Sequence, residues 1–261
     1  MEQETTVADL GARLSDLLRL RTLPIGLKLF ENVSEAEAIP GLRRPPAGEV
    51  FTTCQLVTQS RIAGITLGIF GDNLLPKSNC GAVIGLTQLS EEHSSGRRME
   101  GVWFQNRTAA AAHQAQMPRV LQGRYKALVA SPLRSGRLSP PDTVLFYANP
   151  AQMILFINGL QWKNYRRLEF SITGESACAD SWGRALSTGT ASLSIPCYAE
   201  RRYGGVADDE LLMAVPPLDL AIAITGLEGL SKAGLRYPIL PYGTIADPSR
   251  GMSKSYAATP E

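Results

Sequence analysis

Hydrophobic and polar positions along the chain predict amphipathic helices that alternate with short apolar strands. Helices are expected over 6–20, 51–63, 108–116, 150–162, 178–186, 208–215 and 218–234. Strands are expected over 23–30, 65–70, 125–130, 142–148, 169–173 and 190–195. This alternation indicates an α/β or mixed α+β fold, in which a layered sheet has flanking helices.

The chain is long enough, at 261 residues, to bury a core of its own. No internal repeat and no obvious linker divides it. We therefore expect residues 1–234 to form one globular domain, or two closely packed lobes, followed by an extended tail over 235–261. Aromatic residues in that tail, among them Tyr237 and Tyr256, could clasp a second copy of the chain, and a homodimer is expected on this basis.

Charge and hydropathy exclude several partners. The formal net charge is only +2, with 26 Lys and Arg against 24 Asp and Glu, so no broad basic surface for nucleic acid is expected. Apolar stretches are too short to span a bilayer, and the acidic N-terminus does not resemble a signal peptide. We expect a cytoplasmic protein, in which thiols stay reduced.

Four cysteines carry most of the metal-binding and nucleophilic potential of the chain: Cys54, Cys80, Cys178 and Cys197. Thiolates are soft ligands that favour zinc, Cu(I) or iron–sulfur clusters. The closely spaced cysteine pair of most structural zinc sites is absent, whereas clusters can be held by distant cysteines. Free cysteines are also common as small buried apolar residues, and the spacing alone does not decide between the two.

Titratable residues stand next to the second cysteine pair. Glu175 and Asp180 flank Cys178, where they could act as acid or base, or could simply cap a helix. Cys178 lies near an expected helix start, which would lower the pKa of its thiol. No hydrolase, metalloprotease or nucleotide-binding motif is present, so an enzymatic role stays open.

Three basic residues are candidates for binding an anionic substrate. Arg201 and Arg202 follow Cys197 closely and could bind an anion, or could form a solvated turn. Lys28 lies within an apolar run, where it could face an anionic ligand or pack its stem with the charge in solvent. The two histidines, His93 and His113, lie far from the cysteines in sequence.

Several short pieces of the chain together resemble one family. They are PIGLK at 24–28, CGA at 80–82, VLFYANPAQ at 144–152, ACAD at 177–180, IPC at 195–197 and ERR at 200–202. With Cys54 they resemble the DUF169 family of bacterial and archaeal proteins of unassigned function, over roughly 10–220. The resemblance implies that the four cysteines occupy the family's cysteine positions and share a site. It implies no reaction.

The combined expectation is a cysteine-ligated metalloprotein with an iron–sulfur cluster, of the 4Fe–4S type, held by Cys54, Cys80, Cys178 and Cys197. The cluster would have a redox or Lewis-acid role on a small anionic substrate. Asp180 and Glu175 would act as catalytic groups, and Lys28, Arg201 and Arg202 would bind the substrate. The alternatives are a zinc protein, or a metal-free small-molecule-binding or accessory protein whose cysteines are structural.

Overall fold

The structure of the chain is a computed structural model that describes residues 5–241. A six-stranded sheet forms its centre, with strand order β2-β3-β1-β4-β6-β5. All neighbouring strands are antiparallel, so the fold is mixed α+β. The strands are β1 (Ile25–Phe30), β2 (Leu67–Phe70), β3 (Ala127–Pro132), β4 (Thr143–Ala148), β5 (Ser192–Ser194) and β6 (Leu211–Val215).

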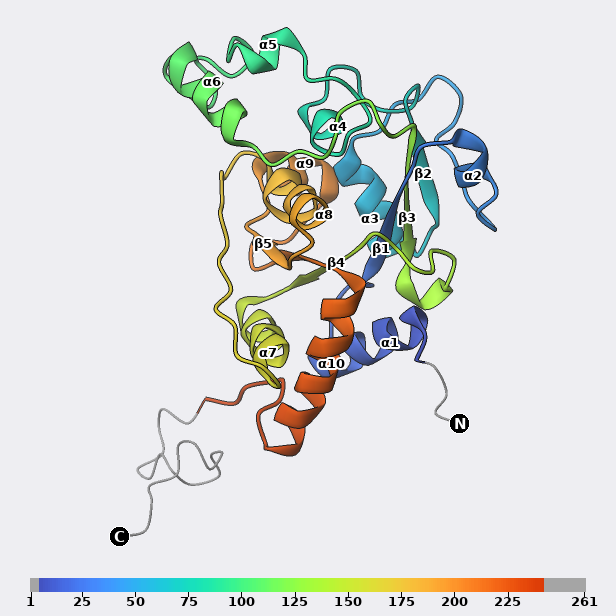
Figure 1. The fold of residues 1–261 in the computed structure, drawn as a ribbon, viewed down its shortest axis with the longest axis vertical. Coiled ribbons are helices and arrows are strands. Elements are labelled where there is room, and N and C mark those ends of the chain that lie inside the picture. Colours follow the sequence, from blue (N-terminus) through green and yellow to red (C-terminus); the bar gives the residue numbers. More distant parts are fainter. Residues whose placement is uncertain (1–4, 242–261) are drawn as a thin grey trace.

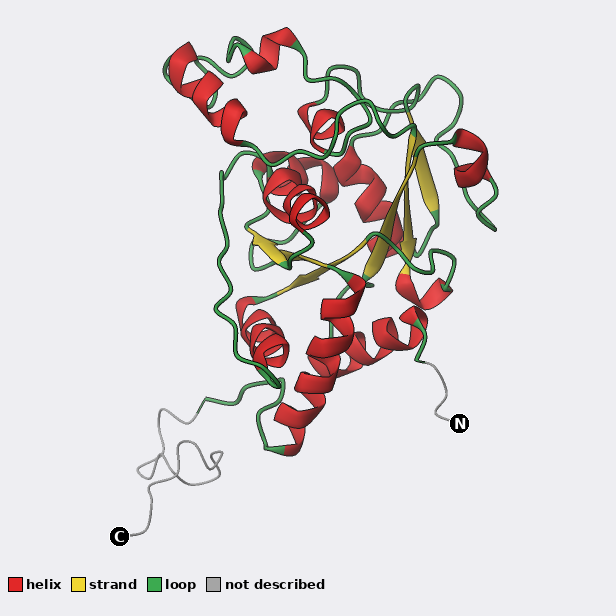
Figure 2. Ribbon diagram, in the orientation of Figure 1, coloured by secondary structure: helices red, strands yellow, loops and turns green. Residues whose placement is uncertain are grey.

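Helices cover both faces of the sheet (Figures 1 and 2). The α-helices are α1 (Val7–Leu18), α2 (Val33–Glu37), α3 (Thr53–Ala63), α4 (Asn79–Val83), α5 (Glu91–Ser94), α6 (Arg107–Gln116), α7 (Pro150–Gln161), α8 (Arg184–Thr188), α9 (Tyr198–Gly204) and α10 (Pro217–Lys232). A 3-10 turn, η1, spans Leu133–Ser135. A π-helix, η2, spans Ala179–Gly183 and runs directly into α8.

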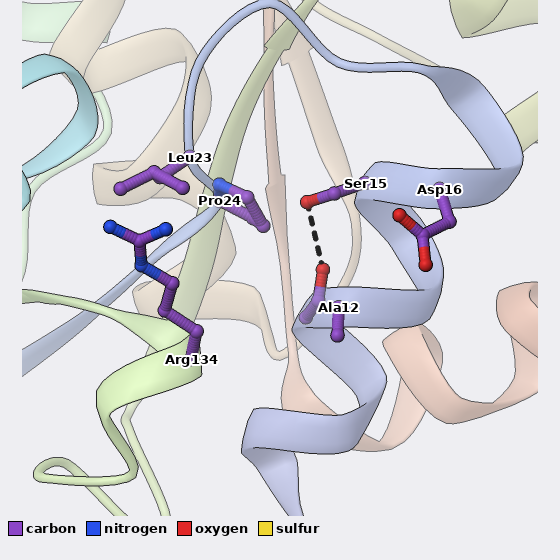
Figure 3. Close-up of a pocket in the computed structure, with 7 residues that line it drawn as sticks. Ala12, Ser15, Asp16, Leu23, Pro24 and Arg134 are labelled. Carbon is purple, nitrogen blue, oxygen red and sulfur yellow. Dashed lines mark hydrogen bonds between the residues drawn. The ribbon is translucent and has the colours of Figure 1, made fainter.

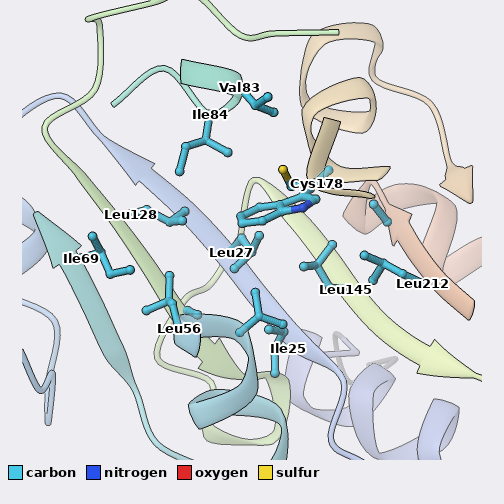
Figure 4. Packing of buried hydrophobic residues seen from close by; sticks show 14 of the residues in the cluster. Ile25, Leu27, Leu56, Ile69, Val83, Ile84, Leu128, Leu145, Cys178 and Leu212 are labelled. Atoms are coloured by element: carbon cyan, nitrogen blue, oxygen red, sulfur yellow. The ribbon is translucent and has the colours of Figure 1, made fainter. Parts of the chain in front are cut away.

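Strand β4 illustrates how the sheet separates two cores. Because successive side chains point to opposite faces, Leu145 and Tyr147 join one core, whereas Val144 and Phe146 join the other. Helices α3, α4 and η2–α8 cover the first face, to which Leu145 and Tyr147 point (Figure 1). Helices α1, α7 and α10 cover the second face, to which Val144 and Phe146 point. We call the first face the cysteine face, because Cys178 packs there among buried apolar side chains (Figure 4).

Helix α1 confirms the amphipathic pattern expected near the N-terminus. Leu10, Leu14 and Leu18 are buried against the second core. Thr6 caps the helix, accepting a hydrogen bond from the Asp9 amide while the Asp9 carboxylate accepts one from the Thr6 amide. Most other predicted helices and strands are likewise present, with ends shifted by a few residues.

The predicted helix over 208–215 is wrong, because this segment contains strand β6. Its acidic start suggested a helix N-terminus, but Asp209 pairs with Arg21, and Glu210 pairs with Arg61. The apolar run Leu211–Val215 instead pairs with β4 on one side and β5 on the other. A strand buried on both faces has a continuous apolar sequence, which periodicity cannot distinguish from a short helix.

The predicted strand over 169–173 is also wrong, since this segment is irregular and mostly exposed. Its alternating pattern has no neighbouring strand to pair with in the described part of the chain. Among residues 5–241, no helix has the length and apolar character that a membrane span requires. The tail residue Tyr256, one basis for expecting a homodimer, lies outside the described residues.

Candidate functional site

All four cysteines lie at the start of a helix. Cys54 and Cys80 are the second residues of α3 and α4, Cys178 directly precedes η2, and Cys197 is the N-cap of α9. The first backbone amides of a helix have no partner within it and can donate to a nearby acceptor. The amides of Ala177 and Glu200 both donate to the Cys197 sulfur. At Cys197 the fold therefore places the thiol beside free backbone donors.

The structure brings the four thiols into one neighbourhood on the cysteine face. Cys80 interacts with the Cys178 thiol, and Cys54 is close enough to Cys80 and Cys197 for their charges to affect its ionisation. Cys197 in turn is influenced by Cys80 and influences Cys178. Each thiol thus has at least two of the others as neighbours, although the two cysteine pairs come from distant stretches of sequence. All four are free cysteines.

Ionisation differs among these thiols. A hydrogen bond with Cys178 lowers the pKa of Cys80 and raises that of Cys178 well above its usual range, with burial adding to the rise. Burial also raises the pKa of Cys54, and it raises the pKa of Cys197 to about 11. The expectation that Cys178 has a lowered pKa is therefore wrong, because its hydrogen bond with Cys80 raises the pKa of Cys178 and lowers that of Cys80.

Close helix packing holds the thiols together. The Thr58 hydroxyl on α3 donates to the Gly204 carbonyl on α9 at 2.7 Å, which joins the helices that carry Cys54 and Cys197. Gly183, at the end of η2, lets that helix approach α4, since a Cβ at this position would lie 2.7 Å from Val83 Cγ1. The π-helix between Cys178 and α8 is a rare conformation that occurs often at functional sites.

A buried polar network adjoins the thiols, and sequence reasoning missed it. The Tyr147 hydroxyl on β4 donates to Glu200 Oε1. The Arg61 guanidinium lies 4.1 Å from the centre of the Tyr147 ring and pairs with Glu210 at 3.2 Å. Burial raises the pKa of Glu200 to about 7, and its charge influences Cys54, among other thiols. In the ERR motif, the glutamate rather than either arginine is the residue whose charge influences the thiols.

The two acids predicted beside Cys178 have different surroundings. Asp180 is buried, and its carboxylate accepts hydrogen bonds from the Thr173 amide at 2.8 Å and the Thr173 hydroxyl at 3.0 Å, which closes the loop before η2. Glu175 has a pKa of about 7, raised by burial and by the charge of Asp180. Its Oε2 has no hydrogen-bond partner, and its charge reaches Cys80. Of the two, Glu175 has the freer carboxyl group.

The three basic residues predicted to bind substrate do not gather at the thiols. Lys28 donates to the Pro140 carbonyl at 3.0 Å, and its position in β1 alternates with Leu27 and Leu29, which point to the cysteine face. Arg201 donates to the Ala207 carbonyl at 2.9 Å and to Asp208. Arg202 is exposed. Arg119 is a cation that does lie near Cys178: burial lowers the pKa of its guanidinium, and the charge of that thiol opposes this shift.

Single-metal sites and histidine ligands find no support in the described part of the chain. Between residues 5 and 241, no three Cys, His, Asp or Glu side chains are close enough together to hold one metal ion. His93 pairs with the Ser90 hydroxyl at 2.9 Å, and His113 stacks against Phe104.

Two cavities lie outside the thiol neighbourhood. The smaller, of about 200 Å³, lies between α1 and the loop before β1 and is lined by Ser15, Pro24 and Arg134 among others (Figure 3). The larger, of about 420 Å³, is lined by residues that include Arg124, Asp142 and Leu186. None of the four cysteines lines either cavity.

Comparisons with known proteins agree with the family resemblance. The sequence pattern of the DUF169 family, described as uncharacterised ArCR, matches residues 13–225. An uncharacterised protein of Methanocaldococcus jannaschii is 24% identical over 126 residues, which cover 48% of this chain and 53% of the relative. The chain thus spans about half the length of this curated relative. No solved structure matches it. Because the family match covers most of its length, the chain belongs to the DUF169 family.

Proposed function

We propose that this protein is a metalloprotein whose four cysteines hold an iron–sulfur cluster of the 4Fe–4S type, with a redox or Lewis-acid role. The observation that carries the proposal is the convergence of Cys54, Cys80, Cys178 and Cys197 from four separate elements. Four free, mutually close thiols with no disulfide between them fit a reducing compartment such as the cytoplasm.

For this set of donors we favour a cluster over a single zinc ion. Within residues 5–241 no three donors suit one ion, whereas a cluster spreads its metal ions over a larger volume and takes one thiolate for each. Burial of the thiols also suits a cluster, because surrounding apolar side chains limit solvent access and influence its reduction potential. With all four thiolates bound, such a cluster carries electrons; with three, one iron is available as a Lewis acid.

The protein's own residues would support the ligands in defined ways. Backbone amides of Ala177 and Glu200 donate to the Cys197 sulfur, and the Ser176 hydroxyl lies 3.3 Å from the Cys178 sulfur. Hydrogen bonds to ligand sulfurs stabilise the thiolate form and shift the reduction potential of a cluster. Arg119 adds a positive charge near Cys178, which offsets the negative charge of a thiolate-bound group.

The test is anaerobic purification of the protein followed by reconstitution with iron and sulfide. We expect a brown protein with iron and acid-labile sulfide in equal amounts, and loss of both in single Cys→Ser variants at the four positions. Ala82→Ser is the matched control, because it also places a hydroxyl at a buried position of α4 but removes no thiol. A colourless wild-type protein, or one that holds only zinc, would overturn the proposal.

The same variants distinguish the metal-free alternative, in which the cysteines are structural. In that case Cys→Ser changes would lower the free energy of unfolding by about 1 kcal/mol, and metal content would be zero throughout. Binding of a small molecule, if present, would then be unchanged by the substitutions.

A further inference from the structure

Glu200 is a buried carboxyl group that the four-thiol site does not by itself explain. The residue is only 5% exposed. Its Oε1 accepts a hydrogen bond from the Tyr147 hydroxyl, whereas its Oε2 is buried without any hydrogen-bond partner. Buried polar atoms nearly always have a partner, because an unpaired one loses its interaction with water and gains nothing in return. The unpaired oxygen therefore indicates a missing partner.

Position on α9 directs this carboxyl toward the thiols. Glu200 and Gly204 are four residues apart, so they share one face of the helix. Gly204 lies against α3 beside Cys54, since a Cβ on Gly204 would be 3.6 Å from Cys54 Cβ. The Glu200 amide donates to the sulfur of Cys197, one turn earlier. The carboxyl charge reaches Cys54, Cys197 and also Cys80.

Neighbouring side chains restrict the orientation of the carboxyl group. Tyr147 on β4 is 2% exposed and holds Oε1 through its hydroxyl. Arg61 covers the Tyr147 ring and is itself fixed by its ion pair with Glu210. With Oε1 engaged on the sheet side, Oε2 is the atom left to meet a ligand. Such preorganised second partners are typical of metal-binding side chains.

We propose that Glu200 is an oxygen donor of the cysteine site, binding through Oε2 the iron that a cluster held by three thiolates leaves open, while Tyr147 holds Oε1. The inference rests on the proposed cluster. A carboxylate oxygen is a harder ligand than a thiolate and exchanges more readily with a substrate oxygen. A cluster bound in this way would be asymmetric, with one metal ion distinct from the rest.

Glu175 is the alternative candidate for this role, because its Oε2 is also buried and has no hydrogen-bond partner. Its carboxyl lies in the loop before η2, and its charge raises the pKa of Cys80, whereas the charge of Glu200 raises the pKa values of three thiols. In the described structure no side chain donates a hydrogen bond to Glu175. It is therefore the matched comparison for any test of Glu200.

The experiment compares reconstituted wild-type protein with the variants Glu200→Gln, Glu175→Gln and Tyr147→Phe. Each substitution keeps the size of the side chain, and circular dichroism with thermal unfolding would verify the fold. The readouts are the Mössbauer and electron paramagnetic resonance spectra of the cluster, and the rate at which a chelator removes iron. We expect Glu200→Gln to abolish the signature of the distinct iron and to speed iron loss about tenfold or more. Tyr147→Phe should have a smaller effect in the same direction.

Three outcomes separate the two proposals. Wild-type spectra and iron-loss rates in a folded Glu200→Gln variant would overturn the oxygen-donor role and leave the cluster intact. The same change seen only in Glu175→Gln would assign the oxygen to Glu175 instead. A reconstituted wild-type protein without iron and sulfide would overturn both proposals. This outcome is measured on the wild-type protein alone and does not depend on the variants.

Discussion

Arg61 and Glu210 form an ion pair of 3.2 Å in which both side chains are almost completely buried. Removing one partner of such a pair leaves an uncompensated charge in the interior, which usually costs about 3–5 kcal/mol. We expect Arg61→Met to lower the free energy of unfolding by about that amount in urea titrations. The double variant Arg61→Met/Glu210→Met should recover a large part of the loss, because it removes both charges.

The surface pair of Arg21 and Asp209 is the control, since both side chains are more than half exposed. Arg21→Met should change the free energy of unfolding by less than about 1 kcal/mol. If Arg61→Met and Arg21→Met lower the free energy of unfolding equally, burial of the Arg61–Glu210 pair does not increase its contribution to stability.

Gly159 and Gly226 face one another where α7 and α10 pack, so that the two backbones are in contact. A Cβ on Gly159 would lie 2.7 Å from the Ala223 carbonyl oxygen, and one on Gly226 would overlap Gly159 itself. Gly226→Ala should lower the free energy of unfolding by about 2 kcal/mol or more, although alanine is the better helix former. Thr225→Ala, at the neighbouring exposed position, should be nearly neutral; similar losses in both variants would contradict the packing argument.

Stability should depend on pH through Glu175 and Glu200, whose pKa values are raised to about 7 from an ordinary value of 4.5. Between these values the folded protein retains protons that the unfolded chain has lost. The stabilisation is therefore complete below about pH 4.5 and is lost as pH rises through 7. Each group could contribute up to about 3 kcal/mol to this change.

Urea titrations of the metal-free protein between pH 4.5 and 7.5 would measure this dependence. Glu175→Gln should reduce the fall in the free energy of unfolding across that range, and Glu175→Gln/Glu200→Gln should reduce it further. Glu35→Gln, on an exposed part of α2, should leave the profile unchanged. If the free energy of unfolding changes with pH by the same amount in the wild-type protein and in all variants, the assignment to Glu175 and Glu200 is refuted.

Chemical modification should discriminate among the thiols. Cys80 is half-buried, whereas the other three cysteines are buried, and its pKa is lowered by the hydrogen bond with Cys178. The thiolate is the reactive form of a cysteine. In the metal-free folded protein, iodoacetamide should therefore modify Cys80 about tenfold or more faster than the other three cysteines. Peptide mass spectrometry would locate the label, and protein unfolded in urea, in which all four should react alike, is the control. Preferential labelling of Cys54 would contradict the expected order.

Local pattern predicted most elements of the fold but not the pairing of the strands. Helix α1 and the helix after Asn149 have both a regular apolar face and a capping residue, so their starts could be located. Strand β6 could not be recognised, because its apolar run is continuous and its neighbours in the sheet are distant in sequence. The antiparallel order of the six strands is a property of tertiary packing, which periodicity does not encode.

For the candidate site, residue chemistry was the better guide and proximity in sequence the poorer one. The four cysteines stood out because the chain has few other soft donors. Arg201 and Lys28 are candidates only through their neighbours in sequence, since Arg201 bonds to the nearby Ala207 carbonyl and Lys28 points away from the cysteine face. Glu200 and Tyr147 are 53 residues apart, and only the fold brings them into contact.

The placement of each cysteine on a different element also governs when the site can come into existence. Cys54 and Cys80 are synthesised long before Cys178 and Cys197, and the strands that align the two halves include β6, which follows all four. No early fragment of the chain therefore presents a complete set of donors. A group that requires all four thiols can be held only after Cys197 has been synthesised and the elements that carry the cysteines have packed together, so its binding would report that this part of the chain has folded.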